Sequence, residues 1–120
     1  MKILNLTQHE ATEKQLKDGV VEPSKELKER IKSMLTFEDI PTKKEMSEVA
    51  KELVQFVKEY DCEGAMIGGA MFFMSTLENA LKQENLTPYY AFSKRESEEK
   101  LVDGVVKKVS LFKYIGLIKM

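Results

Sequence analysis

The sequence predicts an α/β domain with three layers, built on a mixed, mainly parallel sheet of about five strands whose C-terminal strand is antiparallel. Short apolar runs at residues 2–6, 64–67 and 87–92 are separated by amphipathic segments of helical period, which is typical of parallel strands joined by helices. Asp103-Gly104 lies between two apolar pairs and predicts a hairpin turn into a long final strand, residues 107–119. These features favour a sheet with helices on both faces.

Length and composition indicate one domain, residues 1–120. The chain has 120 residues, of which 42% are hydrophobic, and this gives room for a single core. Its formal charge of -1 disfavours a protein that coats long nucleic acid. Residues 94–120 hold seven Lys or Arg against four Asp or Glu, a net charge of +3, which leaves -4 for the rest. Positive charge therefore collects in the C-terminal part.

The cysteine and histidine content excludes several kinds of site. Cys62 is the only cysteine, so an internal disulfide and a cysteine-based zinc cluster are excluded, and we expect a buried thiol. His9 is the only histidine, which excludes a histidine-pair metal site within one chain, and we expect neither a metal nor a cofactor. The apolar run at residues 1–6 is too short for a signal peptide, and no stretch reaches the length of a membrane span. We expect a soluble, cytoplasmic protein with no membrane partner.

The N-terminal half is predicted to place a polar turn after the first strand. Thr7-Gln8-His9 follows the run at residues 2–6 directly and supplies donors and acceptors. A short helix over residues 12–18, stopped by Gly19, then precedes a short strand at residues 19–22. Two longer amphipathic helices are expected over Lys25–Leu35 and Lys43–Tyr60. The three predicted N-caps are Thr12, Ser24 and Thr42.

The second half is predicted to form a phosphate-binding rim. Gly68-Gly69 follows the strand at residues 64–67 and opens a helix over Met71–Gln83, whose first N–H groups are free for an anion. We expect the apolar side chains of this helix, including Met71 and Phe72, to pack on the sheet. The strand at residues 87–92 is expected to end by delivering Ser93-Lys94-Arg95. Because ligands bind beyond the carboxyl ends of parallel strands, the glycine pair and Ser93-Lys94-Arg95 should lie at one rim.

Each candidate residue also has a structural interpretation. Lys94 and Arg95 either surround a phosphate or pair with neighbouring glutamates. Gly68-Gly69 either cradles phosphate oxygens or makes a tight turn, and His9 either serves chemistry or is structural. Ser93 can donate to a phosphate, but without a G-x-S-x-G elbow or an acid partner for the histidine we expect no catalytic triad. The aromatic residues that either stack a base or pack within strands are Tyr90, Phe112 and Tyr114.

Several of these segments together resemble a known family. Residues 90–97, 103–107 and 112–114 look like the C-terminal signature of small CRISPR-associated proteins with a single CARF-like domain. Residues 6–9 and 12–15 are similar to the polar turn and T-x-x-Q start of that family. The resemblance implies a Rossmann-like CARF sandwich over residues 1–120. Gly69 and Tyr114 depart from it, because the family often has an acidic residue and a histidine there.

The resemblance implies a homodimer that binds a cyclic oligoadenylate second messenger, with cyclic tetra-adenylate the expected ring, and that cleaves it without a metal. A ribose 2′-hydroxyl would attack its own phosphate and give a 2′,3′-cyclic phosphate. The alternative is a sponge or sensor that binds the ring and leaves it intact; a mononucleotide-binding domain and a structural module are further alternatives. Carried over by position, the catalytic residues are His9, Lys94 and Arg95, and the ligand-binding residues are Thr7, Gln8, Gly68, Gly69, Ala70 and Ser93.

Overall fold

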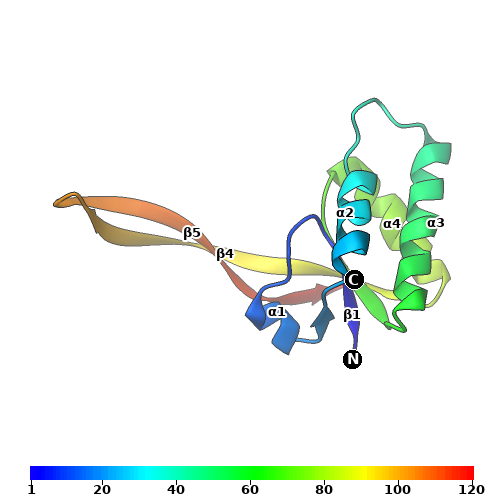
Figure 1. Ribbon diagram of the computed structural model, residues 1–120, viewed down its shortest axis with the longest axis horizontal. Helices are drawn as coiled ribbons and strands as arrows, with labels where there is room; N and C mark the ends of the chain where they lie inside the picture. The colour runs from blue at the N-terminus through cyan, green and yellow to red at the C-terminus, as the bar shows by residue number, and fades with distance from the viewer.

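The strands form one mixed sheet in the order β2-β1-β3-β4-β5 (Figure 1). In this computed structural model, which describes residues 1–120, β1, β2, β3 and β4 run parallel and β5 is antiparallel to β4. The predicted α/β class and mixed five-stranded sheet are therefore confirmed. The elements are β1 (Ile3–Leu6), α1 (Glu13–Lys17), β2 (Val20–Val21), α2 (Lys25–Met34), α3 (Lys43–Glu59), β3 (Gly64–Ile67), α4 (Met71–Gln83), β4 (Thr87–Val102) and β5 (Val105–Lys119).

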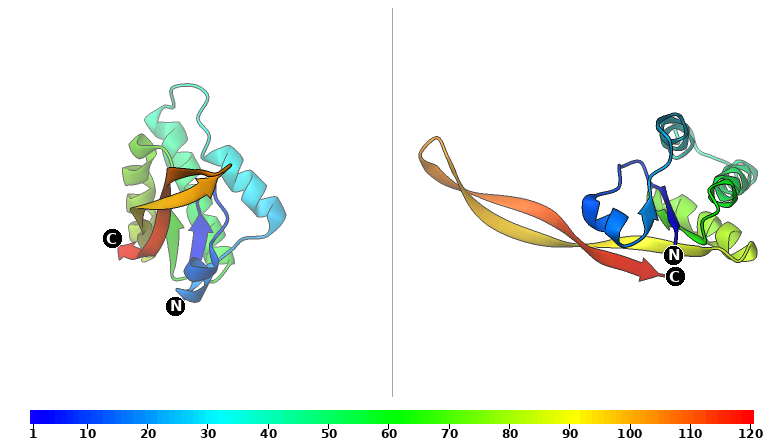
Figure 2. Two further views of the ribbon diagram at one scale, coloured as in Figure 1. Left: turned by 90° about the vertical axis from the view of Figure 1, so that its left-hand side faces the viewer. Right: turned by 60° about the horizontal axis from the view of Figure 1, so that its bottom comes forward.

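The two faces of the sheet are covered unequally, as Figure 2 shows. Leu4 and Leu6 of β1 join a cluster of 16 buried residues under α2, α3 and α4. The alternate residue Ile3 joins a cluster of only four on the opposite face, where the five-residue helix α1 lies. Successive strand side chains point to opposite faces, so the same strands feed both clusters. The result is a Rossmann-like three-layer arrangement with one thick and one thin helical layer.

The helices begin where the sequence predicts them. The hydroxyls of Thr12, Ser24 and Thr42 accept hydrogen bonds from the backbone N–H groups of Gln15, Leu27 and Glu45, which satisfies donors that have no partner inside the helix. Cys62 is buried, as expected, and burial raises the pKa of its thiol. No helix is long and apolar enough to cross a membrane.

The prediction that the strand from Thr87 ends at residue 92 is wrong. β4 continues to Val102 because nearly every residue beyond Phe92 pairs with β5, across a bulge at Phe92/Ser93. The predicted turn at Asp103-Gly104 is confirmed, with φ of 52° and 77°. Residues 93–114 form a two-stranded ribbon that leaves the rest of the molecule, here called the body (Figure 1). The charged segment 96–100 is a strand exposed on both faces, so it lacks the apolar alternation by which a strand is recognised.

The ribbon makes the molecule elongated. The radius of gyration is 16.5 Å and the longest dimension is 54 Å. A compact domain of this length would have a radius of gyration of about 14 Å. Tyr89 and Tyr90 of β4 still lie in the body, whereas residues 91–113 are exposed apart from the half-buried Val109. The carboxyl end of β4 is therefore far from the sheet edge at which β1 and β3 end.

Candidate functional site

A cleft of about 390 Å³ lies where β1 and β3 end and β4 leaves the body. It brings together three segments that are distant in the sequence: the turn after β1, the glycine pair after β3, and the start of the ribbon. This is the carboxyl edge of the parallel strands, at which α/β proteins bind ligands. The residues predicted from sequence that line it are Thr7, Gln8, His9, Gly68, Gly69 and Ser93, and the others are Glu10, Thr12, Gln15, Met66, Ile67, Tyr90 and Ala91.

Asn5 holds the turn formed by residues 7–9. Its side chain is completely buried, and its amide Nδ2 donates to the carbonyl of His9 (2.8 Å) and to Glu22 Oε1 (2.8 Å). Its Oδ1 accepts hydrogen bonds from the backbone N–H of Thr7 (2.9 Å) and from the Thr7 hydroxyl (2.7 Å). All the hydrogen-bonding capacity of a buried amide is thus used to fix one wall of the cleft.

Lys28 of α2 holds the same turn from a second direction. Its ammonium, in a side chain that is 6% exposed, donates to the carbonyls of Thr7 (3.0 Å) and His9 (2.7 Å) and lies 3.3 Å from Glu22 Oε2. Glu22 Oε1 also accepts a hydrogen bond from the backbone N–H of Ala11 (3.0 Å). Asn5, Glu22 and Lys28 are not among the site residues predicted from the sequence. A polar Asn5 inside an otherwise apolar strand was the available signal for one of them.

The side chains of the turn and of α1 are partly used in structure. Gln8 Nε2 donates to the carbonyl of Lys32 (3.3 Å) and to the hydroxyl of Thr36 (3.1 Å), which ties the cleft wall to the end of α2. Thr12 and Gln15 line the cleft but bond each other in a capping box at the start of α1. The imidazole of His9 is exposed and makes no hydrogen bond or ion pair within the chain, so it is available to a ligand.

The glycine pair forms the opposite wall. Gly69 has a φ of 141°, a conformation that favours glycine, and so confirms the predicted tight turn. A Cβ at Gly68 would lie 3.5 Å from Thr7 Cγ2, in ordinary contact, so the two walls approach each other here. α4 starts with Ala70 as its N-cap and with no side-chain cap hydrogen bond. Ala70 itself does not line the cleft.

Of the predicted run Ser93-Lys94-Arg95, only Ser93 lines the cleft. Lys94 and Arg95 are exposed residues of the ribbon rather than the end of a strand at the rim, because β4 does not stop there. In the ladder Ser93 pairs with Tyr114 and Arg95 pairs with Phe112, so Arg95 shares the face of Ser93, whereas Lys94 points to the other face. The cleft lining itself contains no lysine or arginine.

Two tyrosines, the half-buried Tyr90 and the buried Tyr114, anchor β4 and β5 beside the cleft. The hydroxyl of Tyr90 donates to Glu78 of α4 (2.6 Å), and that of Tyr114 donates to Asp18 at the end of α1 (2.8 Å). Burial, followed by the hydrogen bond to a carboxylate, raises the pKa of both phenols well above the ordinary value. The Tyr114 ring is buried and closed to a base, whereas the Tyr90 ring is half-buried and lines the cleft. Phe112 is 76% exposed, far out on the ribbon.

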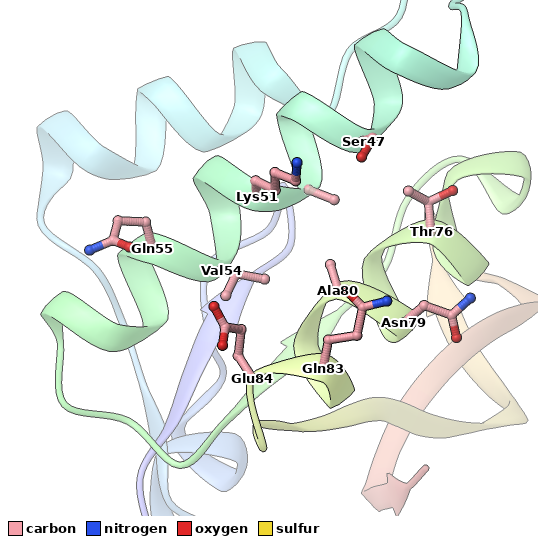
Figure 3. Close-up of a pocket in the computed structure, with 10 residues that line it drawn as sticks. Ser47, Lys51, Val54, Gln55, Thr76, Asn79, Ala80, Gln83 and Glu84 are labelled. Carbon is pink, nitrogen blue, oxygen red and sulfur yellow. The ribbon is translucent and has the colours of Figure 1, made fainter.

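A larger groove of about 650 Å³ lies between α3 and α4, on the helical layer (Figure 3). Small residues, Ala50, Val54 and Ala80, contribute its apolar part, and uncharged polar side chains such as Thr76 and Asn79 line much of the rest. It contains none of the residues predicted for the site, and it lies on helix flanks rather than at the ends of strands. We therefore take the smaller cleft as the candidate site.

Comparison with known proteins gives one match. The model of the uncharacterized protein MJ1673 family matches residues 1–117, and so includes the cleft and the whole ribbon. The chain belongs to this family. No curated protein and no solved structure matches it. Membership shows that the body and the ribbon are parts of one family architecture, while the activity has to be argued from the site.

Proposed function

We propose that the cleft binds a cyclic oligoadenylate and cleaves one of its phosphodiester bonds. The observation that carries the proposal is the convergence of the turn at residues 7–9, the glycine pair and Ser93 at the carboxyl edge of the parallel strands. The cleft of about 390 Å³ is sized for part of such a ring, one nucleotide with its phosphate. A symmetric ring would be held between two copies, each of which contributes one cleft.

The phosphate would lie against the glycine pair. Gly68 and Gly69 present backbone without side chains, and the uncapped start of α4 directs partial positive charge toward the same side. Ser93 adds a hydroxyl donor on the ribbon side. These neutral donors suit the diffuse charge of a phosphodiester.

Cleavage would use the ring's own nucleophile. The ribose 2′-oxygen forms a bond to phosphorus as the bond from phosphorus to the 5′-oxygen breaks, which gives a 2′,3′-cyclic phosphate and a 5′-hydroxyl. His9 would take the proton of the 2′-hydroxyl, and a water molecule would give a proton to the departing 5′-oxygen. Arg95 shares the face of Ser93 and is better placed than Lys94 to stabilise the pentavalent phosphate.

The alternative, a sponge or sensor that leaves the ring intact, is favoured by a specific feature. The cleft lining has no lysine or arginine, and the two cations expected to act on the phosphate lie on the ribbon outside it. Binding requires only the donors that line the cleft. Cleavage requires in addition that a lysine or arginine side chain reaches the phosphate.

The test is incubation of the purified protein with cyclic oligoadenylates of three, four and six units in the presence of EDTA, followed by chromatography. Linear products that end in 2′,3′-cyclic phosphate support cleavage, and tight binding of intact rings supports the sponge. His9→Gln should abolish cleavage but retain binding, and Arg95→Ala should weaken both more than Lys94→Ala does. Lys51→Ala, on the exposed flank of α3, is the matched control. No interaction with any ring overturns the proposal, and equal binding of AMP would indicate a mononucleotide site.

A further inference from the structure

The tip of the ribbon carries apolar side chains that the chain itself does not cover. Leu101, Val102, Val105 and Val106 are between 40% and 74% exposed. An isolated two-stranded ribbon is marginally stable in water, and apolar side chains at its end stabilise nothing while they remain exposed. Figure 1 shows the tip at the far end of the long axis from the helices, so it does not fold back onto its own body.

One face of the tip combines apolar and basic residues. Val102 pairs with Val105, and the next pair on the same face is Lys100 with Lys107. Two lysines directly opposite each other repel, and neither forms an ion pair within the chain. This arrangement is unfavourable in a monomer and becomes favourable when an acidic surface covers the face.

The body has a surface of the complementary kind. The loop between α2 and α3 forms an apolar patch with the start of α4, in which the rings of Phe37 and Phe72 lie 5.3 Å apart and Ile40 is 96% exposed. Glu38 and Asp39 belong to the same surface and also lack an ion pair. The patch thus offers the exposed side chains of Ile40 and Phe72 and the half-buried ring of Phe37 beside two free carboxylates. We call this surface the loop patch (Phe37–Pro41, Met46 and Phe72).

We propose that the ribbon tip of one copy docks on the loop patch of a second copy, with Val102 and Val105 on the apolar residues and Lys100 and Lys107 facing Glu38 and Asp39. The ribbon extends ten residues beyond Phe92 along β4, about 30 Å at the rise of a strand. Both surfaces are present on every chain, so two copies related by a twofold axis bury both tips and both patches. Each copy therefore places its ribbon on the body of the other copy.

This docking has a consequence for the cleft, which rests on the proposed function. The loop patch adjoins the cleft, because Gln8 bonds Thr36 beside Phe37, and α4 begins two residues after Gly69. A ribbon that reaches the patch therefore brings the partner's β5, which carries Lys107, Lys108 and Lys113, beside a cleft whose lining has no lysine or arginine. The second copy would complete the charge of the phosphate site.

Charge reversal tests the docking without any nucleotide. The variant Lys100→Glu/Lys107→Glu places acid against acid, and Glu38→Lys/Asp39→Lys places base against base. Each should raise the dissociation constant of the dimer at least ~10-fold in sedimentation equilibrium. An equimolar mixture should form a heterodimer, because both of its contacts are complementary, and one chain with all four changes should again form a homodimer. Lys51→Glu/Lys82→Glu, which changes the net charge by the same amount on exposed lysines of α3 and α4, is the control.

The outcomes separate the docking from the ligand proposal. The docking is overturned if the wild-type chain is still monomeric in sedimentation equilibrium at about 100 µM, a concentration at which even a weak specific interface should form. This holds whether or not the chain binds cyclic oligoadenylate. A dimer that persists in both charge variants, or variants that do not recombine, also overturns it. Circular dichroism of each variant checks that the body remains folded. Failure to bind any ring, with the dimer and its recombination intact, would reject the ligand and leave the docking standing.

Discussion

Apolar side chains are buried in the body but exposed in the ribbon. In the body, Phe73 and Leu77 of α4 are completely buried in a cluster closed by the chain's own helices. In the ribbon, Phe112 and Leu101 are 76% and 74% exposed, although their strands are fully paired. The strands pair with a neighbour in both regions, and the difference of interest lies in side-chain packing. The body is stabilised by its own buried apolar core, whereas the ribbon exposes apolar side chains that a binding partner could cover.

The strongest test of this comparison replaces the same residue type in both regions. Phe73→Ala should lower the free energy of unfolding by about 3–5 kcal/mol, because it leaves a cavity in the main core. Phe112→Ala should change it by less than about 0.5 kcal/mol, because that ring is exposed. Urea denaturation measures both. A large loss for Phe112→Ala would mean that the ribbon packs on something in solution that stabilises the fold.

Two glycines of the body allow the same substitution to be compared in its interior and in the cleft. Gly64→Ala should lower the free energy of unfolding by about 1–3 kcal/mol, because its Cβ would collide with the carbonyl oxygen of Thr87. Gly68→Ala should be nearly neutral for stability, because its Cβ would make an ordinary contact with Thr7 at 3.5 Å. The added methyl group should nevertheless weaken ligand binding. Equal thermal melting of the two variants would contradict the packing described at Gly64.

Asn5→Asp tests the wall of the cleft without changing side-chain volume. It replaces the donor Nδ2 by an oxygen that faces the carbonyl of His9 and the carboxylate of Glu22. We expect a loss of about 1–3 kcal/mol in the free energy of unfolding, together with weaker ligand binding. Isothermal titration calorimetry and denaturation measure the two effects. Wild-type binding in a stable Asn5→Asp variant would show that the cleft does not depend on this turn.

The smallest expected effect concerns the junction of the two regions. Tyr114→Phe removes the hydrogen bond to Asp18 and should cost about 1 kcal/mol near pH 8. The raised pKa of Tyr114 means that the native state keeps a proton that the unfolded state loses above pH about 10. This contribution is therefore complete below that pH and declines as the pH rises further. The wild type should lose its advantage over the variant as the pH rises above about 10, the ordinary tyrosine pKa.

Tyr90→Phe is the comparison for this experiment. Tyr90 has the same direction of pKa shift but bonds Glu78 within the body. Both variants should show the alkaline effect, but only Tyr114→Phe should speed hydrogen exchange at the start of the ribbon. Equal exchange in the two variants would show that Tyr114 does not anchor the ribbon.

The order and type of the elements could be predicted from local sequence patterns. Hydrophobic period, the caps Thr12, Ser24 and Thr42, and the Asp103-Gly104 turn act through residues close in the chain, so they can be read locally. The meeting of the turn at residues 7–9 with Gly68-Gly69 also followed, because both come directly after parallel strands.

The tertiary structure alone decided the length of β4, the exposure of Met71 and Phe72, and the network of Asn5, Glu22 and Lys28. Met71 and Phe72 were expected in the core but are 90% and 56% exposed, because in the same turn of α4 it is Phe73 and Met74 that pack into the main core. The position of Lys94 and Arg95 outside the cleft depends on β5, which continues to pair with β4 beyond the body. Such outcomes depend on which distant segment covers or pairs with a residue, and that information is not local in the chain.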